Sequence, residues 1–185
     1  TGFTKLSKDT RADAFLSQDN PVLVYKDKVK EIFGLSDPIV IAIQDHSAAG
    51  IFNVRTLQMV ADITEAVNQI DNVNQDRTIS LAIDKSITGT ADGMEVKPFL
   101  ELLEEGTPKD IAQAVHDFPV YEGILVSRDR KMTLIILELF DDDLAELTYQ
   151  KVMEITGQYE TPHFVNIYVA GEGAVLGYLS HYIDE

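Results

Sequence analysis

Apolar and polar positions repeat the same order of strand, helix and strand at two places in the chain. The first place begins with the apolar run DPIVIAI at 37–43, and RTISLAI at 77–83 is predicted to be the returning strand. An unbroken apolar run is typical of a strand that is covered on both faces. Between the two runs, Asn53 is the predicted N-cap of a helix, and Phe52 can pack on Leu57 as a hydrophobic staple. One face of that helix is apolar, formed by Leu57, Val60, Ala61, Thr64 and Val67.

The second place has the same pattern. RKMTLIILELF at 130–140 predicts a strand, and HFVNIYVAG at 163–171 predicts the returning strand. Asp141–Asp143 is expected to open the helix between them, with Asp143 and Glu146 spaced as a capping box. Gly157 is expected to end that helix.

The long segment between the two units is predicted to be an inserted helical arm over about 85–123. Thr107 and Pro108 favour the start of a helix that runs to about Phe118, and a shorter helix is expected over 99–105. After the arm, 124–126 is expected to form a hairpin with the second unit, with its turn at 127–130. Before the first unit, Asn20 and Pro21 indicate a helix that ends at Gly34.

Together these elements predict an α+β fold, a ferredoxin-like split βαβ sandwich whose helices lie on one face of a sheet. We expect 1–185 to be a single domain. Its core units lie at about 37–84 and 124–170, with the helical arm inserted between them.

Charge and composition limit the partners of the chain. It has 31 acidic and 15 basic residues, and its formal net charge is -16. Phosphate-rich partners would be repelled, so nucleic acid and docking on an anionic membrane surface are not expected. There are no cysteines, which excludes disulfides, thiolate nucleophiles and cysteine-ligated metal sites. No apolar run reaches the roughly 18 residues that predict a membrane-spanning helix.

The glycines near the end of the chain are spaced like part of a dinucleotide-binding turn. Gly171, Gly173 and Gly177 follow an apolar strand, but the spacing is GxGxxxG and only eight residues remain after Gly177. A true fingerprint opens a βαβ unit and has an acidic residue about 20 positions further on. We therefore expect these glycines to end a strand, with no bound cofactor.

Catalytic and metal-binding patterns are weak. His46, His116, His163 and His181 lack ligand spacing, and 141–143 lacks the alternating oxygen ligands and the glycine of an EF-hand loop. Glu138 is the one carboxylate in an apolar strand, where an edge-facing or salt-bridged residue explains it. Because no acid–base pair, nucleophile or metal cluster stands out, we predict a protein that is not an enzyme, with no metal.

Three aromatic residues gather on the predicted arm: Phe99, Phe118 and Tyr121. They either pack the arm onto the sheet or line a groove for an apolar ligand.

Several stretches, in order, resemble a known family of transporters. They are AFLSQDNPVLVYKDKVKEIFG at 14–34, DPIVIAI at 37–43, GIFNVRTL at 50–57 and YEGILVSRDRKMTLIILEL at 121–139. The set is similar to the first extracytoplasmic loop of the resistance-nodulation-division exporters, in the branch of the mycobacterial-large-membrane-protein-like and hopanoid-exporter-like transporters. The matching positions are Phe15, Leu16, Asp19, Pro21, Tyr25, Phe33, Gly34, Ile51, Phe52, Thr56, Leu57, Tyr121, Leu125, Val126, Ser127, Asp129 and Lys131.

The resemblance implies a periplasmic porter domain of a proton-driven exporter in the bacterial inner membrane, built from βαβ units. Its substrate would be a hydrophobic small molecule or a lipid, and its partners the second periplasmic loop and the transmembrane helices of the same transporter. The segment 174–185 would lead into the second membrane helix. A free-standing α+β ligand-binding or sensory domain is the alternative, and homo-oligomerisation is left open.

Overall fold

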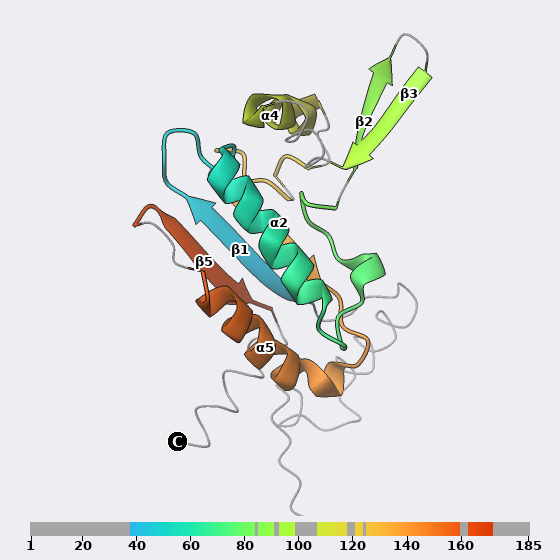
Figure 1. Ribbon diagram of the computed structural model, residues 1–185, viewed down its shortest axis with the longest axis vertical. Helices are drawn as coiled ribbons and strands as arrows, with labels where there is room; N and C mark the ends of the chain where they lie inside the picture. Colours follow the sequence, from blue (N-terminus) through green and yellow to red (C-terminus); the bar gives the residue numbers. More distant parts are fainter. Residues whose placement is uncertain are drawn as a thin grey trace, which may run out of the picture.

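The computed structural model describes residues 38–83, 85–90, 93–98, 107–117, 121–123, 125–159 and 163–171. These residues form a small α+β domain with a three-stranded antiparallel sheet, three α-helices and a separate two-stranded hairpin (Figure 1). The helices predicted at 20–34 and 99–105 and the lead-in at 174–185 lie outside the described residues. The sheet strands are β1 (Ile39–Asp45), β4 (Met132–Leu137) and β5 (Val165–Ala170); the helices are α2 (Val54–Asn68), α4 (Pro108–Asp117) and α5 (Ala145–Gly157). The hairpin is β2 (Lys85–Thr90) and β3 (Gly93–Pro98), and two 3₁₀ turns are η2 (Gln75–Arg77) and η3 (Asp142–Leu144).

The sheet has the order β4-β1-β5, and β1 is antiparallel to both of its neighbours. Ile41 stands opposite Ile135 on one side and Val169 on the other. On the far side of β4, Ile79 forms an antiparallel bridge with Ile136 through two backbone hydrogen bonds of 3.0 and 2.9 Å. β4 therefore lies between β1 and Ile79.

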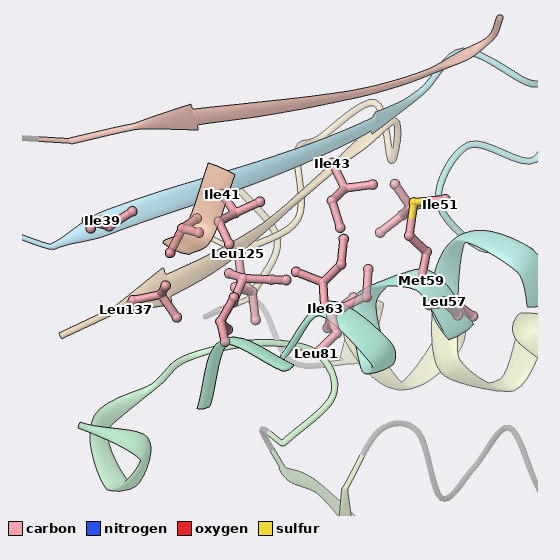
Figure 2. Packing of buried hydrophobic residues seen from close by; sticks show 14 of the residues in the cluster. Ile39, Ile41, Ile43, Ile51, Leu57, Met59, Ile63, Leu81, Leu125 and Leu137 are labelled. Carbon is pink, nitrogen blue, oxygen red and sulfur yellow. The ribbon is translucent and has the colours of Figure 1, made fainter. Parts of the chain in front are cut away.

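The core lies between the sheet and the helices. Ile39, Ile41 and Ile43 of β1 are completely buried, and α2 contributes Leu57 and Ile63 from the facing helix (Figure 2). The helix α5 lies beside α2 and adds Val152, while α4 adds Ile111 and Val115 to the same cluster. Burying a large aliphatic side chain contributes about 1.5–3 kcal/mol, so this one cluster dominates the stability of the domain.

The two faces of β1 are buried to different degrees, which the unbroken apolar run did not predict. Its residues alternate strictly between buried and half-buried positions. Val40 and Ala42 lie on the face away from the helices, and so do their neighbours Leu134 and Tyr168 on the adjacent strands. Alternation follows from the period of two in a strand, which places successive side chains on opposite faces. An apolar run does not reveal this alternation when the second face is apolar too.

The predicted returning strand at 77–83 is reduced to the single bridge at Ile79. Two interactions of Ser80 turn the chain immediately afterwards, because its Oγ accepts a hydrogen bond from the N–H of Ala82 at 2.9 Å and its carbonyl accepts one from Ile83 at 3.1 Å. Serine side chains favour such local turns over a ladder of strand hydrogen bonds.

We had expected the inserted arm to be helical, and this was only partly right. Its first part is the antiparallel hairpin of β2 and β3, in which Thr90 pairs with Gly93. The hairpin extends away from the main sheet (Figure 1). Isoleucine, valine and threonine favour strands, and glycine favours a tight turn. The helix predicted from Pro108 is confirmed as α4, which ends at Asp117.

Side-chain hydrogen bonds cap the start of α2 and of η3. Asn53 caps α2 as predicted, since its side chain accepts the N–H of Thr56 at 3.0 Å. The capping box of Asp143 and Glu146 was wrong: α5 begins after Leu144, which makes no side-chain cap. Asp141 instead caps the 3₁₀ turn η3 by accepting the N–H of Asp143 at 2.9 Å.

Candidate functional site

Of the three aromatic residues predicted on the arm, the structure describes Tyr121 alone. Tyr121 is partly buried and packs against the hydrophobic core. Its carbonyl oxygen accepts the N–H groups of Leu125 and Val126, both at 2.9 Å. Phe99 and Phe118 lie outside the described residues, so the aromatic groove stays a prediction.

The predicted hairpin beside the second unit is confirmed at its turn. The N–H of Ser127 donates to the carbonyl oxygen of Met132 across the turn at 2.9 Å. Val126 forms an antiparallel β-bridge with Thr133 of β4. The hydroxyl of Ser127 donates to the carboxylate of Asp129 at 2.6 Å. This hydrogen bond and the N–H of Lys131 lower the pKa of Asp129.

The glycine at the end of β5 has a structural role. Gly171 has a φ of +113°, and an added Cβ would collide with the carbonyl oxygen of Pro38, the residue before β1. Only glycine tolerates both constraints. Gly173 and Gly177 lie outside the described residues.

A buried carboxylate was missed by the sequence analysis. Asp45, the last residue of β1, has no exposed surface. It accepts hydrogen bonds from the hydroxyl of Thr56 at 2.7 Å, the amide of Asn53 at 2.8 Å and the N–H of Ser47 at 2.8 Å. Burial alone raises its pKa, but these hydrogen bonds outweigh it, so the pKa lies below the ordinary value of 3.8. The available signal was an aspartate directly after an apolar run and close to a predicted N-cap.

The Asp45 network is fully occupied by its own neighbours. The same Asn53 amide also donates to the carbonyl of Gly50 at 2.8 Å. These hydrogen bonds join the end of β1 to the start of α2. They account for the burial of the Asp45 carboxylate without a bound ligand.

The remaining polar candidates are surface groups. Glu138 makes a 2.8 Å ion pair with Arg77, which is one of the two interpretations offered for it, an edge-facing or a salt-bridged residue. His46 and His163 are exposed, and His116 lies 3.5 Å from Glu122. His181 lies outside the described residues. Within the described part of the chain, no group of three or more histidine or acidic residues is arranged to hold a metal ion.

Two surface depressions have definite linings. The first, which we call the α2 hollow, has a volume of about 320 Å³. It is lined by α2, by the residue that follows it and by the chain from η2 onward: Ala61, Thr64, Glu65, Asn68, Gln69, Gln75, Ala82 and Ile83. The hydroxyl of Thr64, one of these lining residues, shares a 2.8 Å hydrogen bond with the hydroxyl of Ser80.

The second depression, which we call the α5 groove, has a volume of about 180 Å³. It lies between the end of the α2 segment and the start of α5. Its lining residues are Ile70, Asp71, Asn72, Leu144, Leu147, Thr148 and Lys151. Its two leucines, Leu144 and Leu147, are about half exposed.

No known protein-family model matches the chain, and no curated protein matches it. None of the helices in the described ranges combines the length and the apolar character that a membrane-spanning helix needs.

Proposed function

We propose that the chain is an extracytoplasmic porter domain of a proton-driven exporter of the resistance-nodulation-division superfamily, handling hydrophobic or lipid-like substrates. The observation that carries the proposal is the order of the sheet. The helix α2 connects β1 to the segment at Ile79, and β4 lies between these two. The helix α5 connects β4 to β5, and β1 lies between these two. Two interlocked units of this kind support a ferredoxin-like split βαβ fold, with its fourth strand shortened to the bridge at Ile79.

Residues that carry the family resemblance occupy structural positions in this fold. Ile51 and Leu57 are completely buried. Leu125 and Val126 are almost completely buried beside β4, and Ser127 makes the turn that follows them. These four buried residues of the matching set therefore belong to the core of the domain, which supports the resemblance, whereas Asp129 of the same set is exposed.

The proposed mechanism is conformational and involves no cofactor. The domain would move as a unit with the membrane helices of its own half of the transporter. That movement would open and close a cleft against the second periplasmic loop. A chain that acts in this way needs a firm core and adaptable surfaces, and no catalytic constellation.

The first test is to read the coding sequence on both sides of this segment. Apolar spans of about 20 residues directly before Thr1 and after Glu185 would support the proposal. A reporter that is active only outside the cytoplasm, fused after Gly171 of the full-length protein, would then be active. A start codon just before Thr1 together with a stop codon soon after Glu185 would overturn the proposal.

The aromatic groove is tested separately in the full-length transporter. Phe99→Ala, Phe118→Ala and Tyr121→Ala should each lower export if these residues line a substrate path. Export and the thermal stability of the isolated domain are both measured. If export is unchanged while the domain loses stability, the three residues pack the arm and bind no substrate.

A free-standing ligand-binding domain is the second candidate, and the α2 hollow favours it. Ligand sites usually have volumes of roughly 300–1,000 Å³, and the hollow reaches the lower end of this range. Its amide side chains fit a small polar molecule. A saturable rise in melting temperature with one member of a metabolite panel, lost in Asn68→Ala but retained in Gln58→Ala, would support this candidate.

A further inference from the structure

The α5 groove has an apolar floor that is open to solvent. Leu144 is 44% exposed and Leu147 is 51% exposed, whereas Ile70 behind them is 6% exposed. A surface leucine alone needs no explanation. Here Leu144 and Leu147 line a concave site together with the buried Ile70.

The size of the groove indicates the kind of group that fits it. Its volume of about 180 Å³ is well below the roughly 300 Å³ at which pockets for whole small molecules begin. It suits a single apolar side chain of the size of leucine or phenylalanine. Such anchor side chains carry much of the binding energy in protein–protein interfaces.

The two walls of the groove are fixed to each other by one side chain. The amide of Asn72 donates to the carbonyl of Asp141 and to the hydroxyl of Thr148, both at 2.9 Å. Its oxygen accepts the N–H of Asp141 at 3.0 Å. Because Asn72 is nearly buried, these bonds hold the groove open in one geometry, and an incoming group meets a preorganised site.

The lining carries one acid, Asp71, and one base, Lys151. Asp141 and Asp143 are exposed and stand just before the lining residue Leu144. Acidic side chains at this end of a helix also favour the helix dipole. An apolar groove with more acids than bases around it, on a chain of net charge -16, is complementary to an apolar side chain flanked by cations.

We propose that the α5 groove docks a segment of a partner protein in which one large apolar side chain is flanked by lysine or arginine. A second copy of this chain is disfavoured by its net charge of -16. An anionic membrane is disfavoured for the same reason. The argument uses the groove alone and does not depend on the exporter proposal.

The probe is a short fluorescein-labelled peptide with a leucine between lysine pairs, and its match carries serine in place of leucine. Fluorescence anisotropy of the 185-residue protein should show the leucine peptide binding about tenfold more tightly, as expected for one apolar anchor. Leu147→Gln should abolish that preference. Met153→Gln changes an equally exposed apolar residue on the same helix, outside the groove lining, and should leave the preference intact.

The acids around the groove are tested with the double change Asp71→Asn and Asp143→Asn. It should weaken both peptides to the same degree and reduce the effect of salt, whereas Asp117→Asn on α4 should not. Circular dichroism confirms that each variant is folded.

Equal binding of the two peptides by the unchanged protein would overturn the proposal. So would a leucine preference that survives Leu147→Gln. Self-association in sedimentation experiments, or binding to anionic vesicles, that is lost in Leu147→Gln would assign the groove to a different occupant and overturn it as well.

Discussion

At the scale of single residues, two buried polar side chains have opposite surroundings. Asp45 is completely buried and accepts hydrogen bonds from three neighbours. Thr133 of β4 is equally buried, but its hydroxyl has no partner among the described residues. A buried group without a partner loses its hydration and gains nothing in return. The first residue should therefore stabilise the fold and the second should weaken it.

Changing Asp45 to asparagine should destabilise the domain by about 1–3 kcal/mol at neutral pH, because three donors lose a charged acceptor. The unchanged protein should also lose stability as the pH falls. The folded pKa of Asp45 lies below 3.8, so its contribution is complete above the unfolded pKa and is lost as the pH falls from the unfolded pKa through the lower folded pKa. Urea unfolding from pH 7 to pH 3 measures both effects. Asp62→Asn, on the exposed face of α2, is the control; an identical acid limb in Asp45→Asn and the unchanged protein would contradict the assignment.

Thr133→Val should stabilise the domain by about 1 kcal/mol, since valine has nearly the same shape and no hydroxyl to desolvate. Thr148→Val is the matched comparison. That hydroxyl donates to the carbonyl of Leu144 and accepts from Asn72, both at 2.9 Å, so its loss should destabilise by about 1–2 kcal/mol. Denaturant midpoints of the two variants should move in opposite directions; a loss of stability in Thr133→Val would show that the hydroxyl has a partner.

At the scale of elements, the two glycines at element ends act differently. Gly171 ends β5 in a conformation reserved for glycine and lies against Pro38. Gly157 is the last residue of α5, and an added Cβ there would meet no atom within 4 Å. Gly157 does mark the predicted end of the helix, but Gln158 is the cap.

Gly171→Ala should lower the free energy of unfolding by about 2–4 kcal/mol, because alanine would be strained and would force β5 away from the start of β1. Gly157→Ala should raise it by up to about 1 kcal/mol, because alanine favours a helix. Thermal unfolding of both variants tests the contrast. Equal melting temperatures for Gly171→Ala and the unchanged protein would show that the contact with Pro38 is dispensable.

The strongly periodic elements were predictable from the sequence. The cap at Asn53, the start of α4 and the strands β1, β4 and β5 follow from periodicity and capping residues. The shortened strand at Ile79 and the hairpin of β2 and β3 were missed, because local turn chemistry overrides an apolar pattern.

Neither surface depression could be predicted from the sequence. The α5 groove joins Ile70 to Leu147, and the fold alone brings these residues together.

At the scale of the whole molecule, the net charge of -16 is the dominant electrostatic feature. Like charges repel most in the compact state, where they are closest. The few basic residues are partly engaged, as in the pair of Arg77 with Glu138. A surface pair of this kind contributes only about 0–1 kcal/mol, so repulsion should prevail.

Adding salt should therefore raise the melting temperature. The screening length falls from about 30 Å at 0.01 M to about 10 Å at 0.1 M, which weakens repulsion across the domain. Calorimetry over this range, with potassium chloride as the salt, provides the measurement. A melting temperature that falls as salt is added would mean that attractive ion pairs outweigh the repulsion.

The position of β1 at the centre of the sheet has a consequence for synthesis on the ribosome. β1 pairs on both sides with strands that are translated much later, since residues 46–131 separate it from β4. Until β4 and β5 have been translated, the isoleucine-rich strand β1 has neither of the strands with which it pairs. Nascent chains of this domain should therefore need protection by a chaperone until Ala170 has emerged. Shortening the inserted arm should reduce this waiting time, and it should speed sheet closure only slightly, because the entropy of closing a loop grows slowly with its length.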